Sequence, residues 1–133
     1  MLKDCLVYTT LPVTDPARAR AFYAEKLGLV PTEPDGDFFE CGAGTRFVIS
    51  LMGSKPAGHT QMGFLVDDLA ADVKRLTSKG VVFEEYDVPS LKTVGAIADR
   101  GDMKVAWFKD SEGNMLGLMQ PVDPAVRKAF GVA

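Results

Sequence analysis

The chain has 133 residues and a mass of 14.3 kDa, which suits one domain that buries a stable core without disulfides or metal ions. Hydrophobic residues make up 47% and charged residues 25% of the chain, an ordinary globular composition that argues against disorder. The formal net charge is -3, and the basic residues are spread without a cluster. A nucleic-acid partner is therefore not expected, because it requires a basic patch.

The sequence also lacks signals for a membrane or for export. It has no apolar run of about 18 residues, so no membrane-spanning helix is expected. The opening segment "MLKDCLVYTT" carries an early acid and no long apolar stretch, which does not suit a secretory signal. Cys5 and Cys41 have no motif spacing and are expected to be reduced thiols. We therefore expect a cytoplasmic protein.

The stretch "DPARARAFYAEKLGL" has the start and stop signals of a short helix over residues 16–27. Asp15 is a good N-cap, Pro16 suits the first helical position, and Gly28 suits the left-handed residue after a helix end. Helical spacing then predicts one buried stripe, made of Ala19, Phe22, Tyr23 and Leu27.

A second copy of this pattern follows further along the chain. "LPVTDPARARAFYAEKLGL" matches "FLVDDLAADVKRLTSKGVVF". In this match Asp68 corresponds to the N-cap Asp15, and Gly80 is the glycine that ends the second helix. The second copy predicts a helix over residues 68–79. Its buried stripe is expected to hold Leu69, Val73 and Leu76.

Strand-like segments follow each helix. The first helix precedes "LVPTE", "DFFEC" and "RFVISLM", and the second precedes "VVFEEYD", "KVAWFKD" and "NMLGLMQ". Turns are expected in "GAGT" and in "SEG", where Gly113 suits a positive φ. The order predicts an α+β protein of eight strands in two βαβββ modules.

The module boundaries follow from the composition of the connecting segments. We expect a first module at about residues 5–52, a Gly/Pro-rich linker at 53–59 and a second module at about 60–120. Residues 88–102 are expected to form a longer loop. "DPAVRKAF", in the tail at 121–133, is expected to be a short helix.

With this order, "LPVTDPARARAFYAEKLGL" and "AWFKDSEGNMLGLMQ" resemble segments of the glyoxalase/bleomycin resistance/dioxygenase group, the vicinal oxygen chelate superfamily. The second segment is close to the Asp-Pro-Asp-Gly-Asn turn of that family, with Ser111 in place of the proline. The resemblance implies mixed, curved sheets around a cavity, with the helices outside. It also implies a homodimer and a small-molecule ligand.

Metal-dependent members of this family typically use His, Glu or Gln ligands, two per module. The resemblance places the ligand positions on Tyr8, Ser50, Gln61 and Gly117, and only Gln61 is a residue type that the family uses there. Such a set is a poor site for a transition metal, so neither a metal ion nor another cofactor is expected. His59, the only histidine, leaves a shifted metal site open as an alternative.

Other catalytic patterns are sparse. The chain has no Gly-rich phosphate loop and no nucleophile elbow. The run Glu84-Glu85-Tyr86-Asp87 offers two pairs of side chains on opposite faces of an extended segment, and one pair could serve as acid and base. The same run also suits a solvated edge strand, so its role stays open.

Strand alternation around the four ligand positions predicts which side chains line the cavity. A hairpin closed by "SEG" pairs Trp107 with Gly117, and a hairpin closed by "AG" pairs Phe39 with Val48. A slip of one residue would invert either assignment. The expected ligand-binding residues are Tyr8, Phe39, Arg46, Ser50, Met52, Gln61, Trp107, Met115, Gly117 and Met119.

This lining is aromatic and rich in methionine, which suits a planar or aromatic ligand. The leading hypothesis is a bleomycin-resistance-like protein that binds a small organic molecule without a protein-bound metal. One alternative is a lyase, isomerase or dioxygenase of the same family with a shifted metal site. Another is a regulatory or structural domain whose cavity is filled by its own side chains. The sequence leaves open whether the protein catalyses any reaction.

Overall fold

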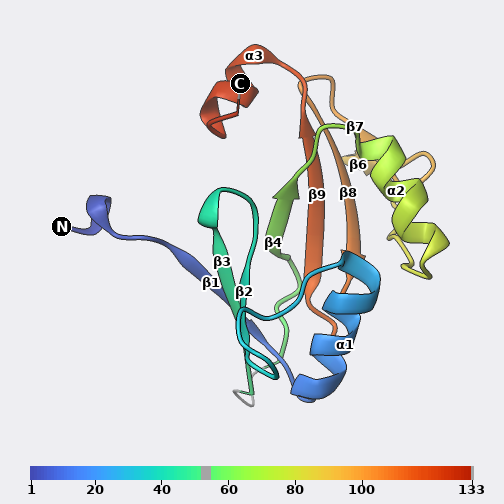
Figure 1. Cartoon of the computed structure of the whole chain (residues 1–133). Coiled ribbons are helices and arrows are strands. Elements are labelled where there is room, and N and C mark those ends of the chain that lie inside the picture. The colour runs from blue at the N-terminus through green and yellow to red at the C-terminus, as the bar shows by residue number, and fades with distance from the viewer. Residues whose placement is uncertain (52–54, 133) are drawn as a thin grey trace. The chain divides into compact units, whose positions relative to one another are not determined.

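The computed structural model describes residues 1–51 and 55–132, and the chain forms two compact units (Figure 1). The first unit contains Met1–Ala57 together with Asp110–Asn114. The second contains Gly58–Lys109 and Met115–Ala133. The five-residue segment Asp110–Asn114 thus belongs to the first unit, although its neighbours along the chain belong to the second.

The first unit is a three-stranded sheet covered by one helix. Its strand order is β1-β3-β2, with β1 parallel and β2 antiparallel to β3. Its elements are the 3-10 helix η1 (Leu2–Asp4), β1 (Tyr8–Pro12), α1 (Pro16–Leu27), β2 (Phe38–Glu40), the 3-10 helix η2 (Gly42–Gly44) and β3 (Arg46–Ser50).

The expected start and end of α1 are confirmed. The Asp15 side chain accepts a hydrogen bond from the Arg18 N–H, and Pro16 is the first helical residue. Gly28 has a φ of 70°, the left-handed conformation that ends a helix at little cost for glycine. The expected stripe is half right, since Ala19 and Tyr23 are buried whereas Phe22 and Leu27 are half-buried.

Aromatic rings hold α1 on its sheet. The Tyr23 ring centroid lies 5.4 Å from that of Phe39 and 5.3 Å from that of Phe47. The Phe39 and Phe47 rings are stacked, with centroids 4.8 Å apart. Leu11 and Ile49 are buried as well. Each such side chain contributes about 1.5–3 kcal/mol by leaving water, which makes this face the core of the first unit.

The hairpin between β2 and β3 corrects the expected position of Phe39. Phe38, not Phe39, pairs with Val48, and Phe39 pairs with Phe47. The reason is the loop, which contains η2 and is closed by a hydrogen bond from the Cys41 N–H to the Thr45 carbonyl. This loop shifts the register by one residue relative to a two-residue turn, and Phe39 therefore points into the core under α1.

Two expected strands are reduced to single bridges. The segment 29–33 forms only the bridge between Pro31 and Phe39, since proline cannot donate to a strand ladder. The segment 81–87 forms the bridge between Phe83 and Phe108 before β5 begins. Conversely, the expected loop at 88–102 contains short strands. The mixed α+β fold class is confirmed, although the strands are not the eight that were expected.

The second unit has a sheet of order β4-β9-β8-β7, in which β4 is parallel to β9 and the other pairs are antiparallel. A separate two-stranded ribbon joins β5 and β6. The elements are β4 (Thr60–Leu65), α2 (Leu69–Ser78), β5 (Asp87–Val88), β6 (Leu91–Lys92), β7 (Ala98–Asp99), β8 (Met103–Lys109), β9 (Met115–Pro121) and α3 (Pro124–Ala129).

Helix α2 covers β8 and β9, as Figure 1 shows. The Asp68 side chain caps it by accepting a hydrogen bond from the Ala71 N–H. The Gln120 Oε1 atom of β9 accepts the Leu69 N–H at 2.9 Å, which satisfies a second free donor of the helix start. The expected stripe is confirmed, because its side chains are buried over Ala106, Phe108, Leu116 and Leu118.

The segment Asp110–Asn114 is a tight turn built around one buried carboxylate. Asp110 Oδ1 accepts the N–H groups of Glu112 and Asn114, and Gly113 has a φ of 88°. Asp110 Oδ2 accepts the Tyr23 hydroxyl at 2.8 Å. Burial, followed by the charge of Asp110, raises the pKa of Tyr23, so its hydroxyl stays a donor. Asn114 Nδ2 donates to the Pro12 carbonyl.

Glu112 fastens the same turn to the start of α1. Its side chain is 1% exposed, and Oε1 accepts the N–H groups of Thr14 and Asp15 at 3.0 and 2.9 Å. Arg18 Nε lies 2.8 Å from Oε2. The Arg18 hydrogen bond is the main cause that lowers the pKa of Glu112 to about 2, while burial opposes it. One carboxylate thus satisfies donors that precede the helix and a cation on its first turn.

We predict that Glu112→Gln lowers the free energy of unfolding by about 2 kcal/mol at pH 7, because a neutral amide loses the ion pair with Arg18. The carboxylate stabilises the fold above its unfolded pKa of about 4.5 and loses this effect as the pH falls toward 2. The difference between wild type and variant should therefore shrink over that range. Urea unfolding at pH 7, 4 and 2.5 measures it.

Glu40→Gln is the matched control. Glu40 pairs with Arg46 at 2.7 Å, but its side chain is 45% exposed, so its loss should cost less than about 1 kcal/mol. Equal effects of the two substitutions, or a Glu112 effect that is independent of pH, would contradict the role of the buried carboxylate.

Candidate functional site

The face of the second sheet that lies opposite α2 carries the only tryptophan. Ala106 and Phe108 are buried on the α2 side, so alternation along β8 places Trp107 on the other side. Trp107 pairs with Gly117 of β9, which confirms the register expected from the turn at 111–113. On its other side, β9 is parallel to β4, and Gly117 pairs there with Gly63. Two glycines therefore lie beside the indole.

The missing side chain at Gly117 leaves space that other groups use. A Cβ atom there would lie 3.4 Å from Thr60 Cγ2 and 3.7 Å from Trp107 Cδ1. The indole Nε1 donates to Thr60 Oγ1 at 3.1 Å. The Tyr86 ring meets the indole edge to face, with centroids 5.6 Å apart and planes at 85°. We call Thr60, Tyr86, Trp107 and Gly117 the Trp107 platform.

Flexible apolar side chains flank the platform. Met115 and Met119 alternate with Leu116 and Leu118 along β9, so they share the face of Gly117, and both are half-buried. Methionine adapts to irregular apolar shapes and contacts aromatic rings favourably. The platform therefore combines one fixed aromatic pair with two adaptable neighbours.

Gln61, which follows Thr60 of the platform along β4, has an unsatisfied polar atom. In the ladder between β4 and β9, Thr60 pairs with Met115 and Met62 pairs with Leu116. Gln61 therefore has no partner in the ladder and is the extra residue of a bulge. Its Oε1 atom is buried and has no hydrogen-bond partner within the described residues. Buried polar atoms are nearly always paired, so an orphaned one suggests a partner that binds there.

The remaining expected residues lie in the first unit. Tyr8, Arg46 and Ser50 share the face of the first sheet that lies opposite α1, as their pairing in the β1–β3 ladder requires. The Arg46 guanidinium lies 2.7 Å from Glu40 Oε2, so it already has an anionic partner. Tyr8 is 64% exposed.

One expected residue, Phe39, does not contribute to either face, and another, Met52, is not described. Phe39 is fully buried under α1, for the reason given by its hairpin, and the expectation that it lines the cavity is wrong. Met52 lies outside the described residues. The second sheet thus brings together Gln61, Trp107, Met115, Gly117 and Met119, and the first sheet brings together Tyr8, Arg46 and Ser50.

Sequence reasoning missed Thr60 and Tyr86. The sequence did contain a signal for Tyr86, because alternation along the acidic run places Tyr86 and Glu84 on one face and Glu85 and Asp87 on the other. No comparable signal existed for Thr60, whose contact with the indole depends on the bulge at Gln61. The acids of the run have other partners, since Glu84 lies 3.8 Å from Lys109 Nζ and Glu85 accepts the Thr93 hydroxyl.

The residues at the family's metal positions do not fit a transition metal ion. Tyr8 pairs with Arg46 whereas Ser50 pairs with Pro12, so four residues, or about 13 Å, separate Tyr8 from Ser50 along the strands. Gly117 has no side chain and so supplies no metal-binding group there. Within residues 1–51 and 55–132, no three His, Cys, Asp or Glu side chains gather in a manner that could hold a metal.

The alternative site at His59 has few donors. The imidazole is exposed, and its Nδ1 lies 2.9 Å from the Thr60 carbonyl oxygen. Only Nε2 is then free to bind a metal, and Gln61 supplies at most a neutral amide oxygen beside it. Elsewhere in the described part of the chain, both cysteines are free thiols. None of its helices has the length and apolar character that crossing a membrane requires.

Comparisons with solved structures give relatives across nearly the whole chain. TnmS3, an antibiotic binding protein from Streptomyces sp. CB03234, is 25% identical with a TM-score of 0.63, and the match covers 92% of this chain and 99% of that one. A superfamily member from Sphaerobacter thermophilus is also 25% identical, with a TM-score of 0.63 and coverage of 90% and 99%. A putative glyoxalase family protein from Bacillus anthracis is 22% identical, with a TM-score of 0.63 and coverage of 86% and 91%.

No curated protein matches the chain significantly. A family model, described as the Glyoxalase/Bleomycin resistance protein/Dioxygenase superfamily, matches residues 6–118. This match spans α1, α2, the first of the two segments on which the resemblance depended and all but the last two residues of the second. The chain therefore belongs to the glyoxalase/bleomycin resistance protein/dioxygenase superfamily.

Proposed function

We propose that this protein binds a planar or aromatic organic molecule against the Trp107 platform, without a protein-held metal ion. One observation carries the proposal. Gly117 stands at a position where the family pattern has a metal-binding residue, and it pairs with Trp107, whose indole Thr60 and Tyr86 contact. A fixed ring of this kind offers a flat apolar surface for stacking. Small-molecule sites typically combine such apolar walls with a few placed polar groups.

Gln61 supplies the polar group in this proposal. Its orphaned Oε1 would accept a hydrogen bond from an N–H or O–H of the ligand, which relieves the cost of an unpaired buried atom. Met115 and Met119 would adjust to the edge of the ring system. Arg46 belongs to the first unit, where it pairs with Glu40, and is not part of this proposal.

The comparison with TnmS3 supports a binding function of this class. That relative is described as an antibiotic binding protein and matches this chain over nearly its full length. We infer that the present protein sequesters a small natural product and does no chemistry on it. A metal-dependent enzyme of the same superfamily receives no support from the donors described above.

The oligomeric state is a second part of the proposal. β1 is an edge strand of its sheet, and the residues at its start expose apolar side chains, with Leu6 92% and Val7 85% exposed. Uncovered edges with apolar side chains tend to associate. We propose that a second copy of the chain covers this edge in a homodimer. The free thiols of Cys5 and Cys41 are consistent with a reducing cytoplasm.

We predict that Trp107→Ala weakens binding of a planar aromatic molecule by about tenfold or more, since stacking adds about 0.5–1.5 kcal/mol to the burial of the ring. Anilinonaphthalene sulfonate and a panel of planar antibiotics are the probes, and calorimetry measures affinity in wild type and variant. In wild type, Trp107 fluorescence reports the same event, because it is the only tryptophan.

Two further variants separate stacking from general loss of apolar surface. Thr60→Val keeps the side-chain shape but removes the acceptor of the indole N–H, so binding should weaken by a few-fold. Phe130→Ala removes an aromatic ring that is 47% exposed at the end of α3 and should leave affinity unchanged. A probe whose affinity survives Trp107→Ala does not use the platform.

For the metal, we predict far less than one transition metal ion per chain after purification without chelators. The physical reason is the donor set, in which Gly117 supplies no ligand and Tyr8 and Ser50 lie too far apart. Elemental analysis by mass spectrometry measures it. About one zinc, nickel, manganese or iron per chain would instead favour a shifted site at His59.

For the assembly, we predict a dimer at micromolar concentration in sedimentation equilibrium. Val7→Lys places a charge at the exposed apolar edge and should shift the equilibrium toward the monomer. Val82→Lys, at a residue that is 83% exposed in the second unit, is the matched control and should leave the dimer intact. A monomeric wild type would contradict this part of the proposal.

A further inference from the structure

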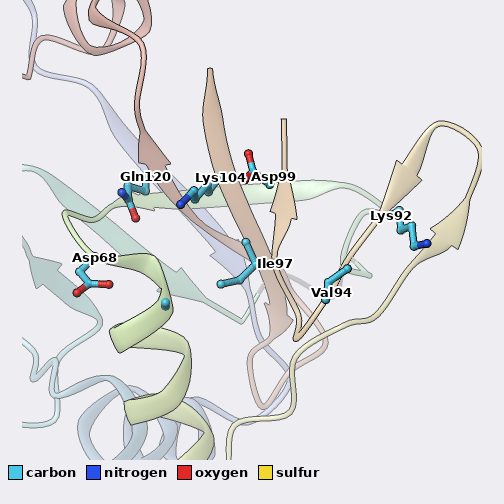
Figure 2. A pocket seen from close by; sticks show the side chains of 8 residues that line it. Asp68, Lys92, Val94, Ile97, Asp99, Lys104 and Gln120 are labelled. Carbon is cyan, nitrogen blue, oxygen red and sulfur yellow. The ribbon is translucent and has the colours of Figure 1, made fainter. Parts of the chain in front are cut away.

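A cavity opens on the α2 side of the second sheet, the side opposite the Trp107 platform. Its volume is about 570 Å³, within the range of small-molecule sites. Lys104 and Gln120 form a ladder pair, and alternation places them on the side of Ala106 and Phe108. Figure 2 shows these two side chains together with Asp68 at one end of the cavity and Lys92 at the other end.

The polar end of the cavity has three groups with spare binding capacity. Lys104 is half-buried and forms no ion pair with any described residue, although Asp99 is its neighbour in the ladder. Gln120 uses Oε1 to accept the Leu69 N–H, which leaves its Nε2 free to donate. Asp68 uses Oδ1 to cap α2, which leaves Oδ2 free to accept.

The neighbouring wall is apolar. Val94 and Ile97 line the cavity and form a bridge with each other, so a short hairpin presents both side chains. In Figure 2, Ile97 lies between the polar end and Val94. The cavity thus offers two cations (Lys92 and Lys104), two carboxylates (Asp68 and Asp99) and the Gln120 amide beside an apolar surface.

We propose that this cavity binds a small zwitterion with an apolar side chain, of the chemical class of the aliphatic α-amino acids. The ligand carboxylate would accept hydrogen bonds from Lys104 Nζ and Gln120 Nε2. Its ammonium would donate to Asp68 Oδ2, and its side chain would lie against Ile97 and Val94.

The balance of charges selects a zwitterion over a simple anion. Two aspartates (Asp68 and Asp99) and two lysines (Lys92 and Lys104) line the cavity, so their formal charges cancel and the cavity does not attract a phosphate by net charge. A plain amine would leave Lys104 without a partner and add a third cation to the cavity. The backbone donors of α2 do not carry the site, because Asp68 and Gln120 already satisfy two of them.

The test titrates the full chain with leucine and follows the Ile97 methyl resonance by NMR. Isocaproate, which lacks the ammonium, and isoamylamine, which lacks the carboxylate, are the matched probes. Leucine should bind with a dissociation constant on the order of millimolar, about tenfold more tightly than either analogue. Equal affinity for isocaproate or for inorganic phosphate would overturn the proposal, as would the absence of any shift of the Ile97 signal.

Two variants test the charged partners. Lys104→Met keeps most of the apolar stem, and Asp68→Asn keeps a good helix cap while it removes the charge. Each should weaken leucine binding by about tenfold. Lys74→Met and Asp67→Asn make the same charge changes at exposed residues outside the cavity and should bind as wild type does. Equal losses in variants and controls would overturn the proposal.

Trp107→Ala distinguishes this cavity from the aromatic site. Because Trp107 points to the opposite side of β8, its loss should leave leucine binding unchanged. Loss of leucine binding in Trp107→Ala would overturn the assignment to this cavity, whatever the outcome for planar ligands.

Discussion

The buried carboxylate of Glu112 is the interaction on which the first unit depends. It accepts the N–H groups of Thr14 and Asp15, which precede α1, and it pairs with Arg18 on the first turn of that helix. Asp110, two residues earlier, holds the Tyr23 hydroxyl at the centre of the aromatic core. A five-residue turn from a distant part of the sequence therefore fixes both the start of α1 and the side chain that joins α1 to its sheet. A buried charge is stable only when it is paired in this way.

The two glycines of the second sheet impose a different constraint. Gly63 and Gly117 pair with each other and leave one patch of the sheet without side chains. Trp107 borders this patch, and Thr60 holds the indole by its N–H. In the superfamily pattern, a last-strand residue at this position supplies a metal ligand. In this chain the same position supplies room, so the scaffold is compatible with ligand binding by shape and stacking where relatives use coordination chemistry.

Features that depend on local chemistry could be predicted from the sequence. The caps of α1 and α2 and the pairing of Trp107 with Gly117 followed from residues within a few positions of each other. Phe39 was misplaced because the number of residues in a hairpin loop, odd or even, decides which face of the sheet each side chain occupies. The segment "GAGT" is compatible with either number. The role of Glu112 was not predictable, because its partners lie more than ninety residues away in the sequence. The same holds for Thr60, which a bulge brings to the indole.

Strand β8 carries side chains of two different kinds on its two faces. Trp107 faces the platform, and Lys104, on the other side, faces the cavity beside α2. Alternation keeps the two side chains apart even though only three positions separate them. The cavity therefore lies beside the helix that Asp68 and Gln120 cap, and the platform lies on the other face of the same sheet.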